Sequence, residues 1–213
     1  MDYQTALLVV RDLQWEDLAA MHAFKSDPLV TRYTDFGVKT WDESRDWLAG
    51  CIHHNTICER VAHNCAIVLS ATGEPIGWIG FGPPNDPADP RGDIDFGYAL
   101  RREFWGQGYT TEALIGMIGF IFATTTAQRI FGECEVANPA SARVMEKAGM
   151  HLATEYTWQD ATTGEIVTSL RYQIKRALRS EDSGQDCECL AGMRQDAFGV
   201  FCYNDAIEIE SID

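Results

Sequence analysis

The sequence lacks an apolar run long enough to cross a lipid bilayer. The longest run, Ala113 to Ala123, has eleven residues, whereas a spanning helix needs about 20. The first residues, Met-Asp-Tyr-Gln-Thr, carry no positive charge, and the apolar stretch at 6–10 is too short for the core of a signal peptide. We therefore expect no membrane partner and a cytoplasmic location.

The sequence also lacks the cysteine spacing of a disulfide framework or a zinc site. Its seven cysteines are odd in number and scattered along the chain. Cys187 and Cys189 are separated by one residue rather than two, and no second pair completes a metal site. We expect reduced thiols and no bound metal.

Positive charge is scarce, with 17 Lys and Arg against 32 Asp and Glu, a net charge of −15. A negative field repels phosphate backbones, so we expect no nucleic-acid partner, whereas cationic or amine-bearing partners are compatible with it. The imbalance is uneven: residues 181–213 hold nine acidic residues and a single base, Arg194. We predict one domain over 1–180 and an acidic C-terminal extension over 181–213, partly ordered or docked on that domain.

Strand-like and helix-like patterns alternate along the remaining chain, whose 46% hydrophobic content can fill a core. Thr40 and Glu43 form a capping box, and the nearly all-apolar segment 109–123 predicts a central, buried helix. We expect strands at 5–10, 65–70, 75–81, 93–101, 129–136, 151–158 and 166–174, and helices at 15–24, 40–53, 109–123 and from 139. Because hairpins are mixed with crossovers, this order predicts an α/β (α+β) fold with a mixed sheet.

The most informative stretch is the glycine loop after the predicted strand at 93–101. Gly106 and Gly108 stand directly before a helix that begins at Tyr109. The free amides and positive dipole of such a helix start suit a phosphate or pyrophosphate, although a tight turn alone also explains the glycines. A dinucleotide fingerprint would need a third glycine where Thr111 stands, and the Walker lysine is absent. A different pyrophosphate ligand is needed.

Two motifs in a fixed order carry a family resemblance. The stretch Phe96-Gly-Tyr-Ala-Leu-Arg-Arg-Glu-Phe-Trp-Gly-Gln-Gly-Tyr-Thr-Thr-Glu-Ala-Leu is followed, about thirty residues on, by Asn138-Pro-Ala-Ser-Ala-Arg-Val-Met-Glu-Lys-Ala-Gly-Met. Together they resemble the GNAT superfamily of acetyl-CoA-dependent N-acetyltransferases, and most closely its RimJ/RimL-like branch of ribosomal-protein N-terminal acetyltransferases. The similarity extends from about Leu7 to Arg176.

The resemblance implies a mainly antiparallel sheet with a splayed central strand pair, flanking helices and acetyl-CoA as co-substrate. In this family the pantetheine arm pairs with the central strand, and the asparagine of the second motif, here Asn138, bonds to it. Asn138 is equally explained as a helix cap. The family's pyrophosphate contacts fall on the backbone amides of Gly106, Gln107, Gly108, Tyr109 and Thr110, and the strand contacts fall on Tyr98, Ala99 and Leu100.

The resemblance also implies direct attack of an amine on the thioester, which needs a base for the amine and a proton donor for the leaving thiol. Asp95 is our first choice of base, because it stands on the central strand two residues before Gly97, where the family often has an acid. Asp93 shares its face, and two carboxylates on one face would raise the pKa of one. Glu133 and Glu135 on the next strand are the rivals. For each of these carboxylates, the alternative is an ordinary surface residue without a catalytic role.

The proton donor implied by the RimJ/RimL-like branch is a serine three residues after the asparagine, which is Ser141. Many members of the superfamily use a tyrosine of the last helix instead, and Met145 occupies that position here. A hydroxyl in the first turn of a helix can stabilise a developing thiolate, although it also serves as a local cap.

The acceptor is less defined than the co-substrate. We expect an amine, either a cationic small molecule or a protein N-terminus, and a protein that is a monomer or a homodimer. Aromatic and histidine residues of the 40–53 helix either line the acceptor side or belong to the core: Trp41, Trp47, His53 and His54. A non-catalytic acyl-CoA sensor on the same fold is the alternative function, and a structural protein that docks through its acidic extension is a third.

Overall fold

The computed structural model describes residues 2–34, 36–57, 60, 62–83, 93–160 and 164–177. The strands are β1 (Asp2–Gln4), β2 (Leu8–Asp12), β3 (His63–Leu69), β4 (Pro75–Gly82), β5 (Ile94–Leu100), β6 (Arg129–Glu135), β7 (His151–Gln159) and β8 (Ile166–Lys175). The helices are α1 (Leu18–Lys25), α2 (Pro28–Thr31), α3 (Trp41–Asn55), α4 (Tyr109–Thr124) and α5 (Pro139–Lys147). The acidic extension and most of the predicted loop at 82–92 lie outside the described residues.

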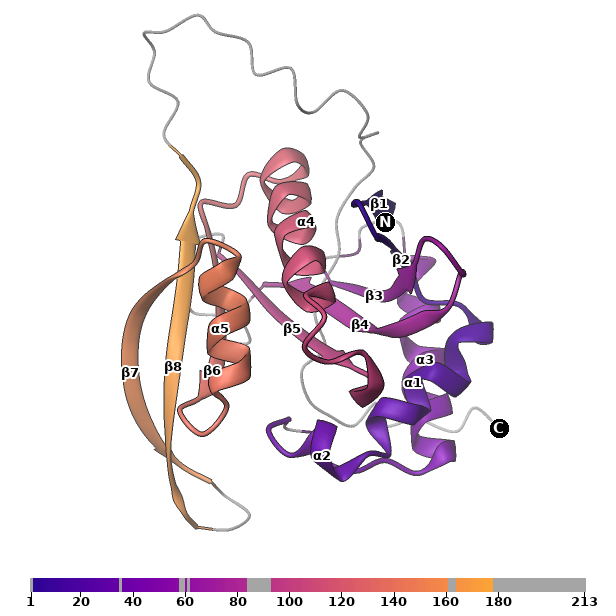
Figure 1. Cartoon of the computed structure of the whole chain (residues 1–213), viewed down its shortest axis with the longest axis horizontal. Helices are drawn as coiled ribbons and strands as arrows, with labels where there is room; N and C mark the ends of the chain where they lie inside the picture. Colours follow the sequence, from indigo (N-terminus) through magenta and orange to yellow (C-terminus); the bar gives the residue numbers. More distant parts are fainter. Residues whose placement is uncertain are drawn as a thin grey trace, which may run out of the picture.

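The described strands form one eight-stranded sheet in the order β1-β2-β3-β4-β5-β6-β8-β7 (Figure 1). All neighbours pair antiparallel except β5 and β6, which are parallel. The predicted class, a mixed and mainly antiparallel sheet with flanking helices, is therefore confirmed.

Helices cover both faces of this sheet. Successive side chains of a strand point to opposite faces, and β4 illustrates the result. Trp78 meets Trp47 of α3 with ring centroids 6.2 Å apart, whereas Phe81 meets Phe120 of α4 at 6.2 Å. The helices α1 and α3 thus lie on one face, and α4 and α5 lie on the other, where Tyr172 of β8 contacts α5.

Local sequence signals place most elements correctly. The capping box at the start of α3 is present, with Thr40 accepting from the Glu43 amide and the Glu43 carboxylate accepting from the Thr40 amide. The short elements β1 and α2 were not predicted, because three or four residues carry too little periodicity to identify them.

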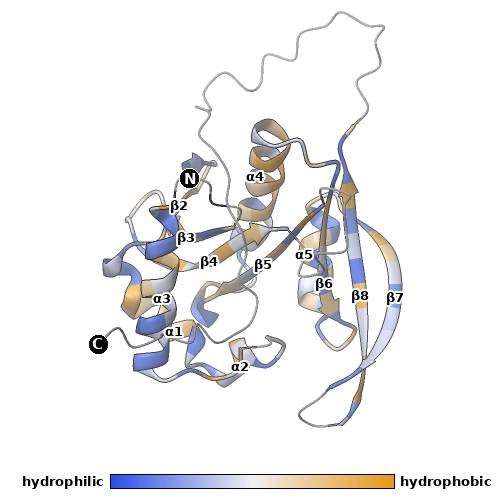
Figure 2. Ribbon diagram, turned by 180° about the vertical axis from the view of Figure 1, so that it is seen from behind, coloured by the Kyte–Doolittle hydropathy of each residue, from blue (hydrophilic) through white to orange (hydrophobic). Residues whose placement is uncertain are grey.

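The prediction of a central, buried helix at 109–123 holds for one face of α4, while the opposite face is exposed. Ala113, Leu114 and Met117 are fully buried, whereas Ile115 is 52% exposed. Figure 2 shows that most of α4 is apolar. The hydrophobic pattern therefore predicts the helix correctly but overestimates how much of it the sheet covers.

The central strand pair separates after a short contact. The parallel pairing of β5 and β6 consists of Ile94 with Ile130 and Asp95 with Phe131. The next pair would be Phe96 with Gly132, and a Cβ atom at Gly132 would lie 2.4 Å from the Phe96 ring. The Phe96 ring occupies the space that a side chain at 132 would need. The strands diverge from this point, as the resemblance implies.

Candidate active site

The glycine loop presents backbone amides to open space. Gly106 and Gly108 have φ angles of +74° and +87°, which favour glycine. A Cβ atom at either position would meet nothing within 4 Å. Gly108 is the N-cap of α4, and among the described residues no side chain caps this helix. The amides of the first turn are therefore oriented to bind an anion such as a pyrophosphate.

The divergence of β6 leaves one edge of β5 open from Phe96 onward. Its other edge is fully paired with β4, from Asp95 to Leu100. An extended ligand can add to such an open edge as a strand would. The carbonyl oxygen of Leu100 already accepts the Trp105 indole N–H at 3.0 Å, so the free contacts lie nearer to Tyr98 and Ala99.

A cleft of about 1080 Å³ lies where the strands diverge. The glycine loop contributes Gly106 and Thr110, and the segment after α2 contributes Arg32 and Tyr33. Tyr33 donates to the carbonyl oxygen of Ala137 at 2.8 Å and thereby joins α2 to the loop before α5. From the strands and α5, the cleft is lined by residues that include Asp95, Phe96, Gly97, Tyr98, Ala99, Leu100, Glu133, Cys134, Glu135, Asn138, Ser141, Tyr156 and Trp158.

Hydroxyl groups gather on the α5 side of the cleft. The Tyr98 hydroxyl lies 2.8 Å from Ser141 Oγ. The Asn138 side chain accepts from the Ser141 amide at 3.2 Å, so Asn138 caps α5 and lines the cleft at once. Cys134 also lines the cleft, and burial raises the pKa of Cys134 to about 11. A protonated thiol is a weak nucleophile, which argues against Cys134 as an acyl carrier.

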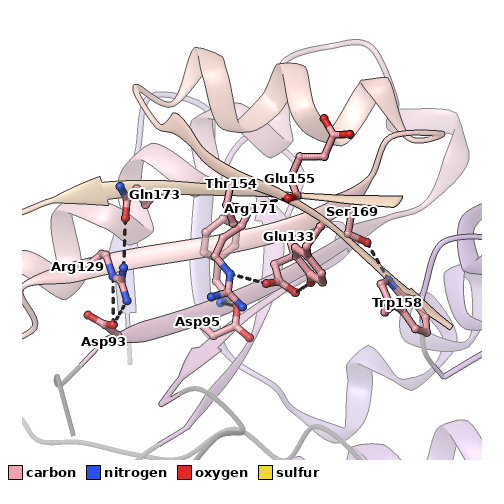
Figure 3. Close-up of polar contacts among 12 residues, drawn as sticks. Asp93, Asp95, Arg129, Glu133, Thr154, Glu155, Trp158, Ser169, Arg171 and Gln173 are labelled. Atoms are coloured by element: carbon pink, nitrogen blue, oxygen red, sulfur yellow. Dashed lines mark hydrogen bonds and ion pairs between the residues drawn. The ribbon is translucent and has the colours of Figure 1, made fainter. Parts of the chain in front are cut away.

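Carboxylates gather on the opposite side. Glu133 accepts from Arg171 Nε at 2.5 Å and from the Tyr156 hydroxyl at 2.6 Å, and Arg171 extends toward both Glu133 and Asp95 (Figure 3). Asp95 Oδ1 also accepts from the Phe96 amide at 2.7 Å. The side-chain carboxylate of Glu135, in contrast, forms no hydrogen bond or ion pair with any residue in the described part of the chain.

Asp93 shares a strand face with Asp95, as expected, but its carboxylate pairs with an arginine. Asp93 is 4% exposed and forms an ion pair with Arg129 of β6, which also bonds to Gln173 of β8 (Figure 3). Its charge is balanced by this arginine. Asp93 does not line the cleft.

The two sides of the cleft correspond to the two faces of the sheet. Directly paired residues point the same way, and Asp95 pairs with Phe131. Strand alternation therefore places Glu133 and Glu135 on the face of Asp95, and it places Cys134 on the face of Tyr98. The contacts agree, because Tyr98 reaches α5 while Glu133 reaches Arg171.

The aromatic residues of α3 do not line the cleft. Trp47 packs against Trp78, and Trp41 lies edge-on to His22 at 5.0 Å. The cleft instead contains Tyr156 and Trp158 from β7, which the sequence reasoning missed. Their alternation along one strand was a usable signal, because it predicts that both point to one face.

Comparison with known proteins identifies the family. The sequence model of the acetyltransferase (GNAT) domain matches residues 8–151. This chain is a GNAT acetyltransferase. The uncharacterized N-acetyltransferase p20 of Bacillus licheniformis is 29% identical over 142 residues, covering 66% of this chain and 77% of p20.

Two solved structures share the GNAT fold at low sequence identity. Spermidine N-acetyltransferase from Vibrio cholerae, in complex with CoA and spermine, aligns with a TM-score of 0.66 at 17% identity, covering 80% of this chain and 96% of that one. RimL, a ribosomal L7/L12 alpha-N-protein acetyltransferase in complex with coenzyme A, aligns with a TM-score of 0.65 at 19% identity, covering 82% and 98%.

These comparisons favour an enzyme over an acyl-CoA sensor or a structural protein. The chain is an N-acetyltransferase, and its general reaction is acetyl transfer to amines. Its described residues include no helix long and apolar enough to cross a membrane.

Proposed function

We propose that this protein transfers an acetyl group from acetyl-CoA directly to a primary amine, with both substrates bound in the cleft at once. One observation carries the proposal. The gap between β5 and β6 has the hydroxyls of Tyr98 and Ser141 on one face of the sheet and the carboxylates of β5 and β6 on the other. A thioester lying in this gap meets a proton donor on its sulfur side and a proton acceptor on its amine side.

The chain's own residues fit the co-substrate. The amides of Gly106, Gln107, Gly108, Tyr109 and Thr110 would hold the pyrophosphate at the start of α4. The open edge of β5 at Tyr98 and Ala99 would hold the pantetheine arm, with Asn138 across the cleft. The space in front of both glycines supports this placement, because a Cβ atom there would have no protein neighbour within 4 Å.

The amine needs a base, because amines with a pKa of about 8 to 10 arrive protonated at neutral pH. We assign this role to Glu135, whose carboxylate lines the cleft without a cationic partner among the described residues. The carboxylate of Glu133 is held by Arg171 and Tyr156, so its protonation would break an ion pair. Asp95, our first choice from the sequence, lies near the same arginine and becomes the alternative.

The leaving thiolate needs a hydrogen-bond donor, and we assign this role to Ser141. Its hydroxyl lies on the hydroxyl side of the cleft, in the first turn of α5, where the helix dipole also favours negative charge. Met145 occupies the position of the tyrosine used by many relatives and is 1% exposed within the core.

For the acceptor we propose a small-molecule amine or a peptide N-terminus in the cytoplasm. Among the described residues, Asp95, Glu133, Glu135 and Asp160 line the cleft together with one cation, Arg32, and Arg171 pairs with Glu133 from outside the lining. The four carboxylates outnumber the two arginines, and this balance favours a cationic amine. The RimJ/RimL-like branch remains a proposal, because the similarity to RimL is at the level of the fold. A domain over 1–180 with an extension over 181–213 also remains a proposal.

Matched glycine variants test the binding of acetyl-CoA. Gly73 in the β3–β4 turn has a φ of +73° and nothing within 4 Å of a Cβ position, as Gly108 has. Alanine at either position costs roughly 1–2 kcal/mol of stability through its left-handed backbone. Only Gly108→Ala should weaken acetyl-CoA binding, by about tenfold or more in calorimetry. Equal affinities in the two variants would remove the glycine loop from the site.

A second experiment tests the base. Turnover is measured over a panel containing spermidine, a peptide with a free N-terminus and phenethylamine. Glu135→Gln should lower kcat by about 10²- to 10⁴-fold at neutral pH. The loss should shrink as the pH approaches the pKa of the amine, because the free amine needs no base. A larger loss in Asp95→Asn than in Glu135→Gln would move the role to Asp95.

A further inference from the structure

The Ser141 hydroxyl has a single proton, and a neighbouring protein group can compete with the leaving sulfur for it. A serine hydroxyl has one hydrogen and two acceptor lone pairs. If Ser141 donates to a neighbouring protein group, it has no proton left for a leaving sulfur. The identity of its partner on the protein side therefore decides whether Ser141 can act.

That partner is Tyr98. The two hydroxyl oxygens are 2.8 Å apart, and either can be the donor. The other acceptor near the Tyr98 hydroxyl is the carbonyl oxygen of Ser141, at 3.3 Å. An O–H···O bond is strongest at about 2.7–2.8 Å, so the Tyr98 proton is best placed on Ser141 Oγ.

The surroundings of Tyr98 favour the donor role as well. Its ring stacks on Phe96 with centroids 6.0 Å apart, which directs the hydroxyl toward α5. Burial raises the pKa of Tyr98 well above its ordinary value, so the phenol keeps its proton. On the opposite side Ser141 faces Cys134 and the cleft.

We propose that Tyr98 is a positioning residue that donates its hydroxyl proton to Ser141 Oγ and so keeps the Ser141 proton directed at the sulfur of coenzyme A. This inference rests on the role proposed above for Ser141. Tyr98 itself does not exchange a proton with either substrate. It holds the serine rotamer and fills one lone pair of Ser141 Oγ, so that the Ser141 hydroxyl keeps its own proton to donate into the cleft.

The test compares Tyr98→Phe and Ser141→Ala, singly and together, in the full chain. Tyr172→Phe is the matched control, because Tyr172 donates to Glu146 of α5 at 2.9 Å but does not line the cleft. With the fastest amine of the panel, Tyr98→Phe should lower kcat about 3- to 10-fold, the value of one hydrogen bond, and should leave the KM for acetyl-CoA nearly unchanged. Tyr172→Phe should leave kcat unchanged.

The double variant distinguishes positioning from an independent role. If Tyr98 acts through Ser141, adding Tyr98→Phe to Ser141→Ala should cost no further activity. Independent, multiplying losses would overturn the inference. A normal kcat in Tyr98→Phe beside a reduced one in Ser141→Ala would overturn it too, while leaving the proposed function intact. A normal kcat in Ser141→Ala would overturn both the role of Ser141 as donor to the sulfur and the role of Tyr98 as positioning residue.

A spectroscopic measurement needs no amine. The thiol of bound coenzyme A is titrated through its ultraviolet thiolate absorbance, as a difference against the same protein alone. A donor aimed at the sulfur lowers the pKa of this thiol. Tyr98→Phe should raise it by about 0.4–1 pH unit relative to the unmodified chain, toward the value in Ser141→Ala. An identical titration in Tyr98→Phe and the unmodified chain would overturn the inference.

Discussion

The burial of His63 predicts that the protein loses stability as the pH falls below about 6.5. The imidazole is 6% exposed and stacks on Phe81 with centroids 4.5 Å apart, and its Nδ1 has no hydrogen-bond partner among the described residues. Burial, and to a lesser extent the charge of Arg60, lowers the pKa of His63 from 6.5 to about 3. The folded state therefore binds this proton less readily than the unfolded state does.

The direction and size of the pH effect on stability follow from this difference between the folded-state and unfolded-state pKa of His63. A histidine with a lowered folded-state pKa contributes its full stability above the unfolded-state value of about 6.5 and loses it as the pH falls toward about 3. The loss is about 1.4 kcal/mol per pH unit within this window. At about pH 5 the contribution to the free energy of unfolding is therefore smaller by about 2 kcal/mol than at about pH 7.5.

The assay is urea unfolding at these two pH values for the unmodified chain and for His63→Phe, which keeps a ring on Phe81. The carboxylates titrate in both proteins, so the difference between the two pH dependences isolates His63. We expect the variant to lose about 2 kcal/mol less on acidification. His151→Phe, at an exposed position of β7, is the control. Parallel losses in the unmodified chain and His63→Phe would refute the reasoning.

Three further substitutions should change the free energy of unfolding, as measured by urea denaturation. Two of them should lower it and one should raise it. Gly132→Ala should destabilise by about 1–3 kcal/mol, because its Cβ would lie 2.4 Å from the Phe96 ring; no loss would mean that the ring moves freely. Gly119→Ala, in α4 with nothing within 4 Å, should stabilise by about 0.5–1 kcal/mol; a loss would reveal a hidden contact. Asp93→Asn should cost about 3 kcal/mol by leaving Arg129 unpaired, and an unchanged midpoint would show that water compensates that charge.

Local signals predicted those parts of the site that depend on neighbours in sequence. The glycine loop, the Asn138 cap and the start of α4 follow from which residues can adopt a positive φ or accept a first-turn amide. The structure has all three where the sequence places them. Roles assigned to Ser141 and Glu135 remain predictions, because they concern chemistry rather than placement.

Features set by residues far apart in sequence were not predicted. Asp93 and Asp95 do share a strand face, but the arginine that pairs with Asp93 comes from position 129, and strand alternation within β5 carries no information about it. The aromatic lining from β7 depends on which strand becomes the edge of the sheet. The separation of β5 from β6 was expected from the family resemblance alone, because Phe96 meets Gly132 across two strands and no local signal shows this contact.

The separation of β5 from β6 explains how one short gap in a sheet can have different functional groups on its two faces. Because alternation continues along each strand after the pairing ends, residues on β6 still divide between two faces, with Cys134 on the face of Tyr98 and Glu135 on the face of Asp95. A group lying between the strands is therefore approached by hydroxyls from one face and by carboxylates from the other. A register shift of one residue would exchange the two faces of β6 and turn its carboxylates toward α5.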